Sequence, residues 1–301
     1  MRVFLTGATG YIGSVVAEKL RAKGHEVIGL ACTDSAATHL EERSIRVYRG
    51  ELLNQGSMES AARFCDAVIH TASHNDVHSK KTDLATVQAV LRALEGTNKP
   101  FVYTSAVWVL GATGDTMADE DSPVNPLRLV EWRCEIEQLV LDGKNRGART
   151  IVIRPGVVYG RGQGIPAMFV RKPARFDAII HYVGDGNTRW PVVHVEDLAE
   201  LYILAMEKAP AGSILHGVDS SSVRVSDIVQ AAVQGANEHR TLESWDLQEA
   251  RRHLGAFADA LMLDQQVSSE KTKALLGWRP KKRTIREEFL RGSYGGSCVC
   301  S

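Results

Sequence analysis

Short apolar runs alternate with amphipathic stretches along the first half of the chain. The opening run, residues 2–6, has the composition of a buried strand, and Ile12, Val15, Val16 and Leu20 then recur at the spacing of one helix face. The same pattern predicts strands at 26–31, 45–49, 67–71, 101–105 and 150–154, and helices at 12–23, 35–43, 57–64, 83–95 and 127–141. Such regular alternation predicts an α/β fold with a doubly wound parallel sheet and helices on both faces.

Three glycines separate the first strand from the first helix. Gly7 allows a sharp turn, Gly10 lets the backbone approach a ligand, and Gly13 lets the helix pack closely on the strand. The first turn of the helix then offers amide groups and the positive end of its dipole to an anion. With a strand before and a helix after, the pattern indicates a Rossmann-type site for a dinucleotide pyrophosphate. A glycine-rich turn in another kind of α/β protein is the alternative.

The regular pattern breaks after Pro155. Residues 156–190 are rich in Gly, Pro and Arg, with an apolar patch at 178–183. Further elements are predicted at 191–195, 196–208, 214–218, 226–235, 247–254, 269–276 and 284–290. We therefore expect a dinucleotide-binding domain over 1–160, to which 191–222 returns, and a small, mostly helical, discontinuous substrate-binding cap made of 161–190 and 223–292. Residues 293–301 are expected to form a flexible tail, although Cys298-Val-Cys-Ser301 formally fits a prenylation box.

Composition narrows the function classes. Apolar residues make up 44% of the 301 residues, enough for a large core. The 36 basic and 36 acidic residues balance, which argues against a general nucleic-acid or membrane surface, and no stretch approaches the roughly 18 apolar residues of a membrane span. The chain opens on a strand, and its five cysteines, a terminal pair apart, lack metal or disulfide spacing. These features predict a cytoplasmic protein without a secretory signal.

Seven motifs in a fixed order carry a family resemblance. They are Thr6-Gly-Ala-Thr-Gly-Tyr-Ile-Gly13, Gly50-Glu-Leu52, Asp66-Ala-Val-Ile-His-Thr-Ala-Ser73, Phe101-Val-Tyr-Thr-Ser105, Arg154-Pro-Gly-Val-Val-Tyr-Gly160, Val193-His-Val-Glu-Asp-Leu-Ala199 and Lys273-Ala-Leu-Leu-Gly-Trp-Arg-Pro280. Over residues 1 to about 292 the chain resembles the extended or atypical short-chain dehydrogenase/reductase superfamily, of the NAD-dependent epimerase/dehydratase type.

The resemblance implies a set of dinucleotide contacts. The pyrophosphate contacts would be Gly7, Thr9, Gly10, Tyr11 and Ile12, and the adenine contacts Glu51 and Leu52. The ribose and phosphate contacts would be Thr71, Ala72 and Ser73, with Thr104 on the next strand, and those of the nicotinamide end Pro155, Val157 and Val158.

The end of the second strand bears on the choice of dinucleotide. An acidic residue there would bond the 2′-hydroxyl of NAD and repel the 2′-phosphate of NADP. This chain has Cys32 at that place, and the hydroxyls of Thr33 and Ser35 follow. Asp34 would instead repel the 2′-phosphate and so favours NAD, and there is no arginine at this place in the sequence. We expect NADP, with NAD as the alternative.

The chain departs from the resemblance at the reacting groups. The family pattern implies a tyrosine that transfers a proton, a lysine four residues later and a serine or threonine on the fifth strand. By alignment, Leu129 takes the tyrosine position, Arg133 the lysine position and Ala106 the serine position. The spacing predicts that Leu129 and Arg133 share a helix face. Arg133 can donate hydrogen bonds to ribose hydroxyls or to an oxyanion, and a surface arginine is the alternative.

Other residues could supply the missing chemistry. Tyr159, on the lip of the crevice, and His194, near a strand-to-helix junction, are candidate proton donors, against purely structural roles. Ser105 replaces the missing serine if the register differs by one residue. The remaining candidates are His74, Asp76 and His78 for orienting a substrate or binding a metal, Trp108 and Trp190 for the pocket wall, and Arg171, Arg175 and Arg189 for an anionic ligand.

Three functions are compatible with these residues. The first is an NAD(P)-dependent oxidoreductase, a carbonyl reductase or dehydrogenase that acts on a small organic molecule with an atypical proton donor. The second is a dinucleotide-binding sensor or scaffold without turnover, and the third a non-redox isomerase, cyclase or dehydratase. Pairing through the helices at 83–95 and 127–141 would give a homodimer, as the resemblance implies.

Overall fold

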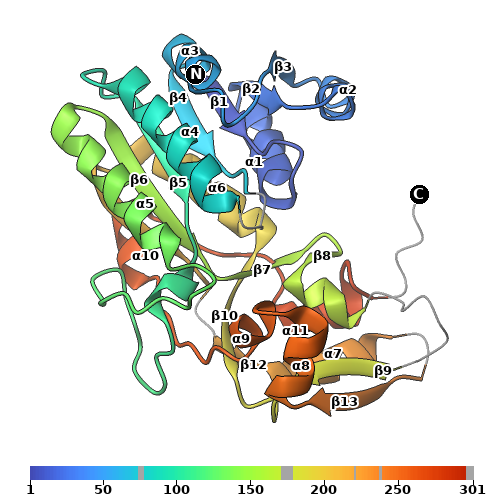
Figure 1. The fold of residues 1–301 in the computed structure, drawn as a ribbon. Helices are drawn as coiled ribbons and strands as arrows, with labels where there is room; N and C mark the ends of the chain where they lie inside the picture. The colour runs from blue at the N-terminus through green and yellow to red at the C-terminus, as the bar shows by residue number, and fades with distance from the viewer. Residues whose placement is uncertain (74–77, 171–178, 220–221, 237–238, 296–301) are drawn as a thin grey trace.

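The computed structural model describes residues 1–73, 78–170, 179–219, 222–236 and 239–295. Figure 1 shows two parts: a large sheet flanked by helices, and a smaller group of short strands and helices. No helix among the described residues is long and apolar enough to cross a membrane. The candidate residues His74, Asp76, Arg171 and Arg175, and the terminal Cys298-Val-Cys-Ser301, lie outside the described ranges.

A seven-stranded, all-parallel sheet forms the larger part, in the order β11-β6-β5-β4-β1-β2-β3. Its strands are β1 Arg2–Thr6, β2 Glu26–Ala31, β3 Arg46–Arg49, β4 Ala67–His70, β5 Pro100–Thr104, β6 Arg149–Pro155 and β11 Ser213–Gly217. From β1 the chain first builds outward through β2 and β3 and then crosses to the other side of β1 at β4, so the strand order reverses between β1 and β4, where Thr6 pairs with His70. In such sheets ligands bind outside the carboxyl ends of the strands, at the reversal.

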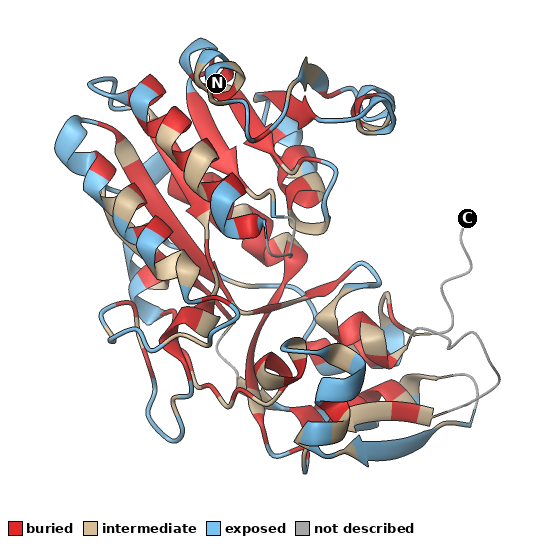
Figure 2. Ribbon diagram, viewed as in Figure 1, coloured by how far each residue is buried: buried red, intermediate tan, exposed pale blue. Residues whose placement is uncertain are grey.

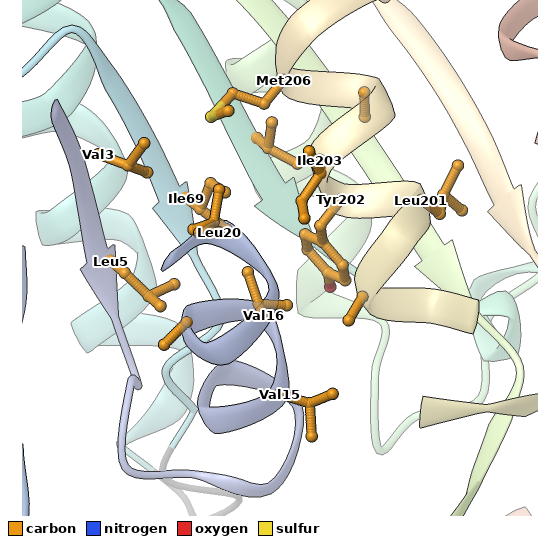
Figure 3. Close-up of a cluster of buried hydrophobic side chains, with 14 of the residues drawn as sticks. Val3, Leu5, Val15, Val16, Leu20, Ile69, Leu201, Tyr202, Ile203 and Met206 are labelled. Atoms are coloured by element: carbon orange, nitrogen blue, oxygen red, sulfur yellow. The ribbon is translucent and has the colours of Figure 1, made fainter. Parts of the chain in front are cut away.

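Helices cover both faces of this sheet, which confirms the predicted fold class. They are α1 Tyr11–Ala22, α2 Asp34–Glu42, α3 Gln55–Phe64, α4 Ser79–Leu94, α5 Trp132–Asp142 and α6 Val195–Lys208. One apolar layer packs α1, α2 and α6 on the sheet, and Figure 3 shows Val16 of α1 beside Tyr202 of α6. A second layer joins α3, α4 and α5 to the other face. Apart from β3 at one edge and the start of β11 at the other, the strands between the layers are almost wholly buried (Figure 2).

The smaller part has its own apolar core, which includes Phe169, Trp190 and Phe289. Two small sheets run through it, β12-β10-β7-β8 and β13-β9. Their strands are β7 Val157–Gly160, β8 Gln163–Gly164, β9 Ile179–Val183, β10 Arg189–His194, β12 Ser222–Arg224 and β13 Thr241–Trp245. Its helices are α7 Val225–Gly235, α8 Leu247–Leu254, α9 Phe257–Leu261 and α11 Ile285–Arg291. The predicted cap segments, 161–190 and 223–292, are mostly helical, with α7, α8, α9 and α11 beside the short strands β8, β9 and β13, while the domain boundaries stay a prediction.

Two short 3-10 turns and one further helix add to these elements. The 3-10 turns Val107–Leu110 and Ile165–Phe169 follow β5 and β8, and α10 (Glu270–Leu276) packs beside β11 and α6. Helix α5 begins at Trp132, five residues later than predicted. Pro123 and Pro126 precede it in a stretch without regular structure, and residues 128–131 form turns.

Candidate functional site

The turn between β1 and α1 has no room for side chains at two of its glycines. Gly7 has φ +73°, and a Cβ there would lie 2.7 Å from the amide nitrogen of Ala72. A Cβ on Gly13 would lie 2.1 Å from the carbonyl oxygen of Gly7. No side chain caps the amino end of α1 at Gly10. Bare amides at a helix start, in a turn that only glycine can form, fit a pyrophosphate.

A cavity of about 560 Å³ opens from this turn along the carboxyl ends of the strands. Sixteen of the predicted site residues line it: Gly7, Thr9, Gly10, Tyr11, Ile12, Cys32, Leu52, Thr71, Ala72, Ser73, Thr104, Ser105, Arg133, Pro155, Val157 and Val158. It runs from the ends of β1 and β2 to the ends of β5 and β6. This course suits an elongated dinucleotide with its adenosine near β2 and its nicotinamide near β6.

Three predicted contacts, Thr33, Ser35 and Glu51, do not line the cavity. The hydroxyl of Thr33 accepts a hydrogen bond from the amide of Ala36 and so caps α2. Sequence reasoning also missed Arg49, which pairs with Ala31 across β2 and β3. Its Nη1 lies 2.5 Å from Oδ1 of Asp34. An arginine therefore stands beside the end of β2, and the expectation of none there has to be corrected.

At the other end of the cavity, Ser105 follows β5 directly. Its residue is only 4% exposed, and its hydroxyl oxygen has no hydrogen-bond partner among the described residues. A buried hydroxyl without a partner is costly unless a ligand or water completes its bonding. Because Ser105 also lines the cavity, this hydroxyl is available to a bound molecule. Ala106, which the family alignment places at the serine position, lies beside it in the cavity wall.

Arg133 lies in the cavity wall and is not a surface arginine. Its side chain is 12% exposed, and its guanidinium stacks on the ring of Trp132 at 4.5 Å. Nη1 donates to the carbonyl oxygen of Thr104 at 3.0 Å, and Nη2 lies 3.5 Å from the hydroxyl of Ser73. Leu129 is 39% exposed and precedes α5, so the predicted shared helix face of Leu129 and Arg133 is wrong.

Tyr159 and His194 lie outside the cavity wall. Tyr159 is 1% exposed, and its hydroxyl donates to the carbonyl oxygen of Arg283 at 2.8 Å. Burial raises the pKa of Tyr159 further above its ordinary value, which makes it a weaker acid. His194 packs edge-on against Tyr159 and caps α6, because its Nδ1 accepts from the amide of Glu196. Burial lowers the pKa of His194. We therefore do not retain either residue as a proton donor.

Replacement of Tyr159 by phenylalanine tests this reassignment. The change removes the hydrogen bond to Arg283 and the interaction of the hydroxyl with Asp219, so we expect a loss of about 1–3 kcal/mol in the free energy of unfolding and no change in turnover. Denaturant unfolding and steady-state rates would measure the two effects. A large fall in turnover with an unchanged fold would restore Tyr159 as a proton donor.

Of the remaining tryptophan and arginine candidates that the structure describes, one lines the cavity and two lie outside its wall. Trp108 lines the cavity, whereas Trp190 is buried and donates to the carbonyl oxygen of Leu261. Arg189 pairs with Asp264 and Asp115 and is not in the cavity wall. Within the described residues, no group of three or more His, Cys, Asp or Glu side chains could hold a metal ion.

Fold and cavity define the class: an α/β protein with a Rossmann-type dinucleotide site. The chain belongs to the NAD dependent epimerase/dehydratase family, whose model matches residues 3–216. This confirms the family predicted from the seven sequence motifs.

Known proteins resemble the chain over nearly its whole length. The uncharacterized protein C2A9.02 of Schizosaccharomyces pombe is 32% identical and covers 98% of this chain and 100% of itself. A 4-hydroxy-2-methyl-3-oxo-4-farnesyl-3,4-dihydroquinoline-1-oxide ketoreductase of Stigmatella aurantiaca is 25% identical over 85% of this chain and 80% of its own. The structure of Thermus thermophilus UDP-glucose 4-epimerase in complex with NAD has a TM-score of 0.81 at 21% identity, over 99% of this chain and 100% of the other. Family and relatives support a dinucleotide-dependent enzyme.

Proposed function

We propose that the protein is an NADP(H)-dependent carbonyl reductase or dehydrogenase acting on a small organic molecule. The observation that carries the proposal is the buried, unpartnered hydroxyl of Ser105 in the cavity wall, among the described residues. It lies on the same strand end as Thr104, whose carbonyl oxygen holds Arg133. A hydroxyl donor and a cation at one end of a dinucleotide cavity suit a substrate oxygen that gains negative charge.

The side chains have separate tasks in this proposal. Ser105 donates a hydrogen bond to the substrate oxygen and orients it. Arg133 stabilises negative charge on that oxygen or holds a ribose hydroxyl, but its pKa stays above about 12, so it is no ordinary proton donor. A bound nicotinamide supplies or accepts the hydride. In the reductive direction, the substrate oxygen would take its proton from a water molecule held by Ser105 and Arg133, and the hydroxide that remains would be neutralised by bulk solvent.

The apolar cavity wall at this end supports an organic substrate. Ala106, Trp108, Val158 and Ile165 line the same cavity as Ser105, and Ala106 and Trp108 follow it closely in the sequence. The ring of Trp108 packs edge-on against Phe257 of α9, so the cavity wall is continuous with the apolar core of the smaller part. The Stigmatella aurantiaca relative is a ketoreductase, which supports reduction of a ketone.

Turnover with a panel of aldehydes and ketones tests the proposal. The purified protein and NADPH would be mixed with each carbonyl compound, and loss of the reduced nicotinamide absorbance followed. We expect NADPH consumption with at least one apolar carbonyl compound and a matching alcohol product. NADPH binding with no consumption across the panel would favour a sensor or scaffold. Product formation without net oxidation of NADPH would favour an isomerase, cyclase or dehydratase.

The ion pair between Arg49 and Asp34 supports NADP over NAD. Asp34 alone would repel a 2′-phosphate, but Arg49 neutralises its charge. The Arg49 side chain is 62% exposed, and exposed ion pairs contribute little to stability. Arg49 can therefore exchange the carboxylate of Asp34 for a phosphate with little loss.

Arg49→Ala is expected to lower NADPH affinity about tenfold and to leave NADH affinity within about twofold. The reason is that only NADPH carries the 2′-phosphate. Titration calorimetry with both dinucleotides would measure the effect. Arg46→Ala, on the same strand but paired with Glu26, is the matched control and should bind both normally. An equal loss for NADPH and NADH would contradict the role of Arg49.

A further inference from the structure

A buried carboxylate lies behind the cavity wall. Asp83 of α4 is 2% exposed, and three groups from other elements surround it. The Tyr103 hydroxyl donates to its Oδ2 at 2.9 Å, His70 Nε2 lies 3.4 Å from its Oδ1, and Arg133 Nη1 lies 3.9 Å from Oδ2. A carboxylate taken out of water is unfavourable unless charged or hydrogen-bonding partners compensate. Here Arg133 is the cation, and it is the same side chain that lines the cavity.

The Tyr103 hydroxyl connects the two charges. Arg133 Nη1 donates a hydrogen bond to this hydroxyl oxygen at 3.4 Å, and the hydroxyl itself donates to Asp83. Burial, and then the charge of Asp83, raise the pKa of Tyr103 well above its ordinary value, so the hydroxyl keeps its proton. Hydrogen bonds in such a chain polarise one another in a low-dielectric interior. One edge of the guanidinium is therefore fixed toward Tyr103 and Thr104.

The far end of the network is anchored beside the glycine turn. His70 stacks on the Tyr103 ring, and its Nδ1 lies 2.6 Å from the hydroxyl oxygen of Thr6, the residue before Gly7. Side chains of β1, β4, β5, α4 and α5 thus meet in one buried group. Such a group has little freedom to rearrange, because every member is held by a separate element.

We propose that Asp83, acting through Tyr103, is a positioning residue that holds the Arg133 guanidinium toward a ribose hydroxyl at the nicotinamide end of a bound dinucleotide. The inference rests on the proposed function, because it needs the dinucleotide in this cavity. Asp83 itself does not line the cavity. Its effect on binding must therefore pass through Arg133, and this distinguishes positioning from direct contact.

A double-mutant cycle tests the inference by binding rather than by turnover. NADPH affinity would be measured for the wild type, Asp83→Asn, Arg133→Ala and the double variant. Asp83→Asn is expected to weaken NADPH binding about tenfold in the wild-type background and by less than about twofold in the Arg133→Ala background. Binding of 5′-ADP, which lacks the nicotinamide ribose, should be unchanged in all four proteins. Equal losses in both backgrounds, or an equal loss for 5′-ADP, would overturn the positioning role.

Tyr103→Phe supplies a second test if Asp83→Asn does not fold. It removes only the connecting hydroxyl and should also weaken NADPH binding without affecting 5′-ADP. Tyr48→Phe is the matched control, since it removes a tyrosine hydroxyl that donates to Ser57 at a distance from Arg133. A Tyr103→Phe variant that binds NADPH normally would overturn the inference. A wild type that binds no dinucleotide would overturn the proposed function and the positioning role together. A wild type that binds NADPH but reduces no carbonyl compound would overturn only the proposed function, and the double-mutant cycle would still test the positioning role.

Discussion

Replacement of Gly13 by alanine is expected to lower NADPH affinity about 100-fold or more. A methyl group there would lie 2.1 Å from the Gly7 carbonyl oxygen and 2.6 Å from the Thr71 hydroxyl, so the turn or α1 must move. Forcing an extra carbon into a packed site costs about 1–3 kcal/mol, and here the displaced atoms are the backbone of the pyrophosphate turn. About 2.7 kcal/mol corresponds to 100-fold in affinity. Titration calorimetry would measure the loss.

Gly56→Ala is the matched control for this change. Gly56 is also a helical glycine, in α3, and the nearest atom to its added Cβ is the Asn54 side-chain oxygen at 3.7 Å. Alanine there should leave NADPH affinity unchanged and raise helix stability slightly. If Gly13→Ala bound NADPH as well as the control does, the dinucleotide would not contact this turn.

The second large effect is expected at Ser105. Ser105→Ala should reduce the turnover number about 100-fold, because one donor to the developing oxyanion is lost. NADPH affinity should change little, since the hydroxyl is assigned to the substrate oxygen. The side chain has no protein partner among the described residues, so its removal breaks no hydrogen bond of the fold. Steady-state rates and NADPH titration on the same preparation would separate the two effects.

Ser60→Ala is the control for Ser105. Ser60 is exposed on α3, its hydroxyl donates to the carbonyl oxygen of Gly56, and it does not line the cavity, so turnover should be unchanged. A Ser105→Ala variant with wild-type turnover would remove Ser105 from the reaction.

Local features of the sequence predicted most of the large sheet. The order of strands and helices through β6 follows from apolar periodicity, and the glycine turn at Gly7 is a contiguous signal. The smaller part was harder, because β9 pairs with β13 from about sixty residues further along the chain. Pairing between distant segments leaves no local pattern, so the β13 strand was not predicted.

The same limit explains the site residues that sequence reasoning misplaced. Val157 and Val158 of β7 line the cavity, whereas the next residue, Tyr159, packs on His194 and donates to Arg283, two residues far from it in the sequence. Arg49 comes beside the end of β2 only through the pairing of β2 with β3. Asp83, Tyr103 and Arg133 likewise meet only when α4, β5 and α5 pack together. The residues near Gly7 that line the cavity could be predicted because the motif that contains them is contiguous.

Titration of the purified, nucleotide-free protein with NADPH and NADH tests the central claim most directly. The account predicts saturable binding of one dinucleotide per chain, tighter for NADPH and greatly weakened by Gly13→Ala. No detectable heat of binding with either dinucleotide, by a protein whose fold is verified in the same preparation, would contradict it.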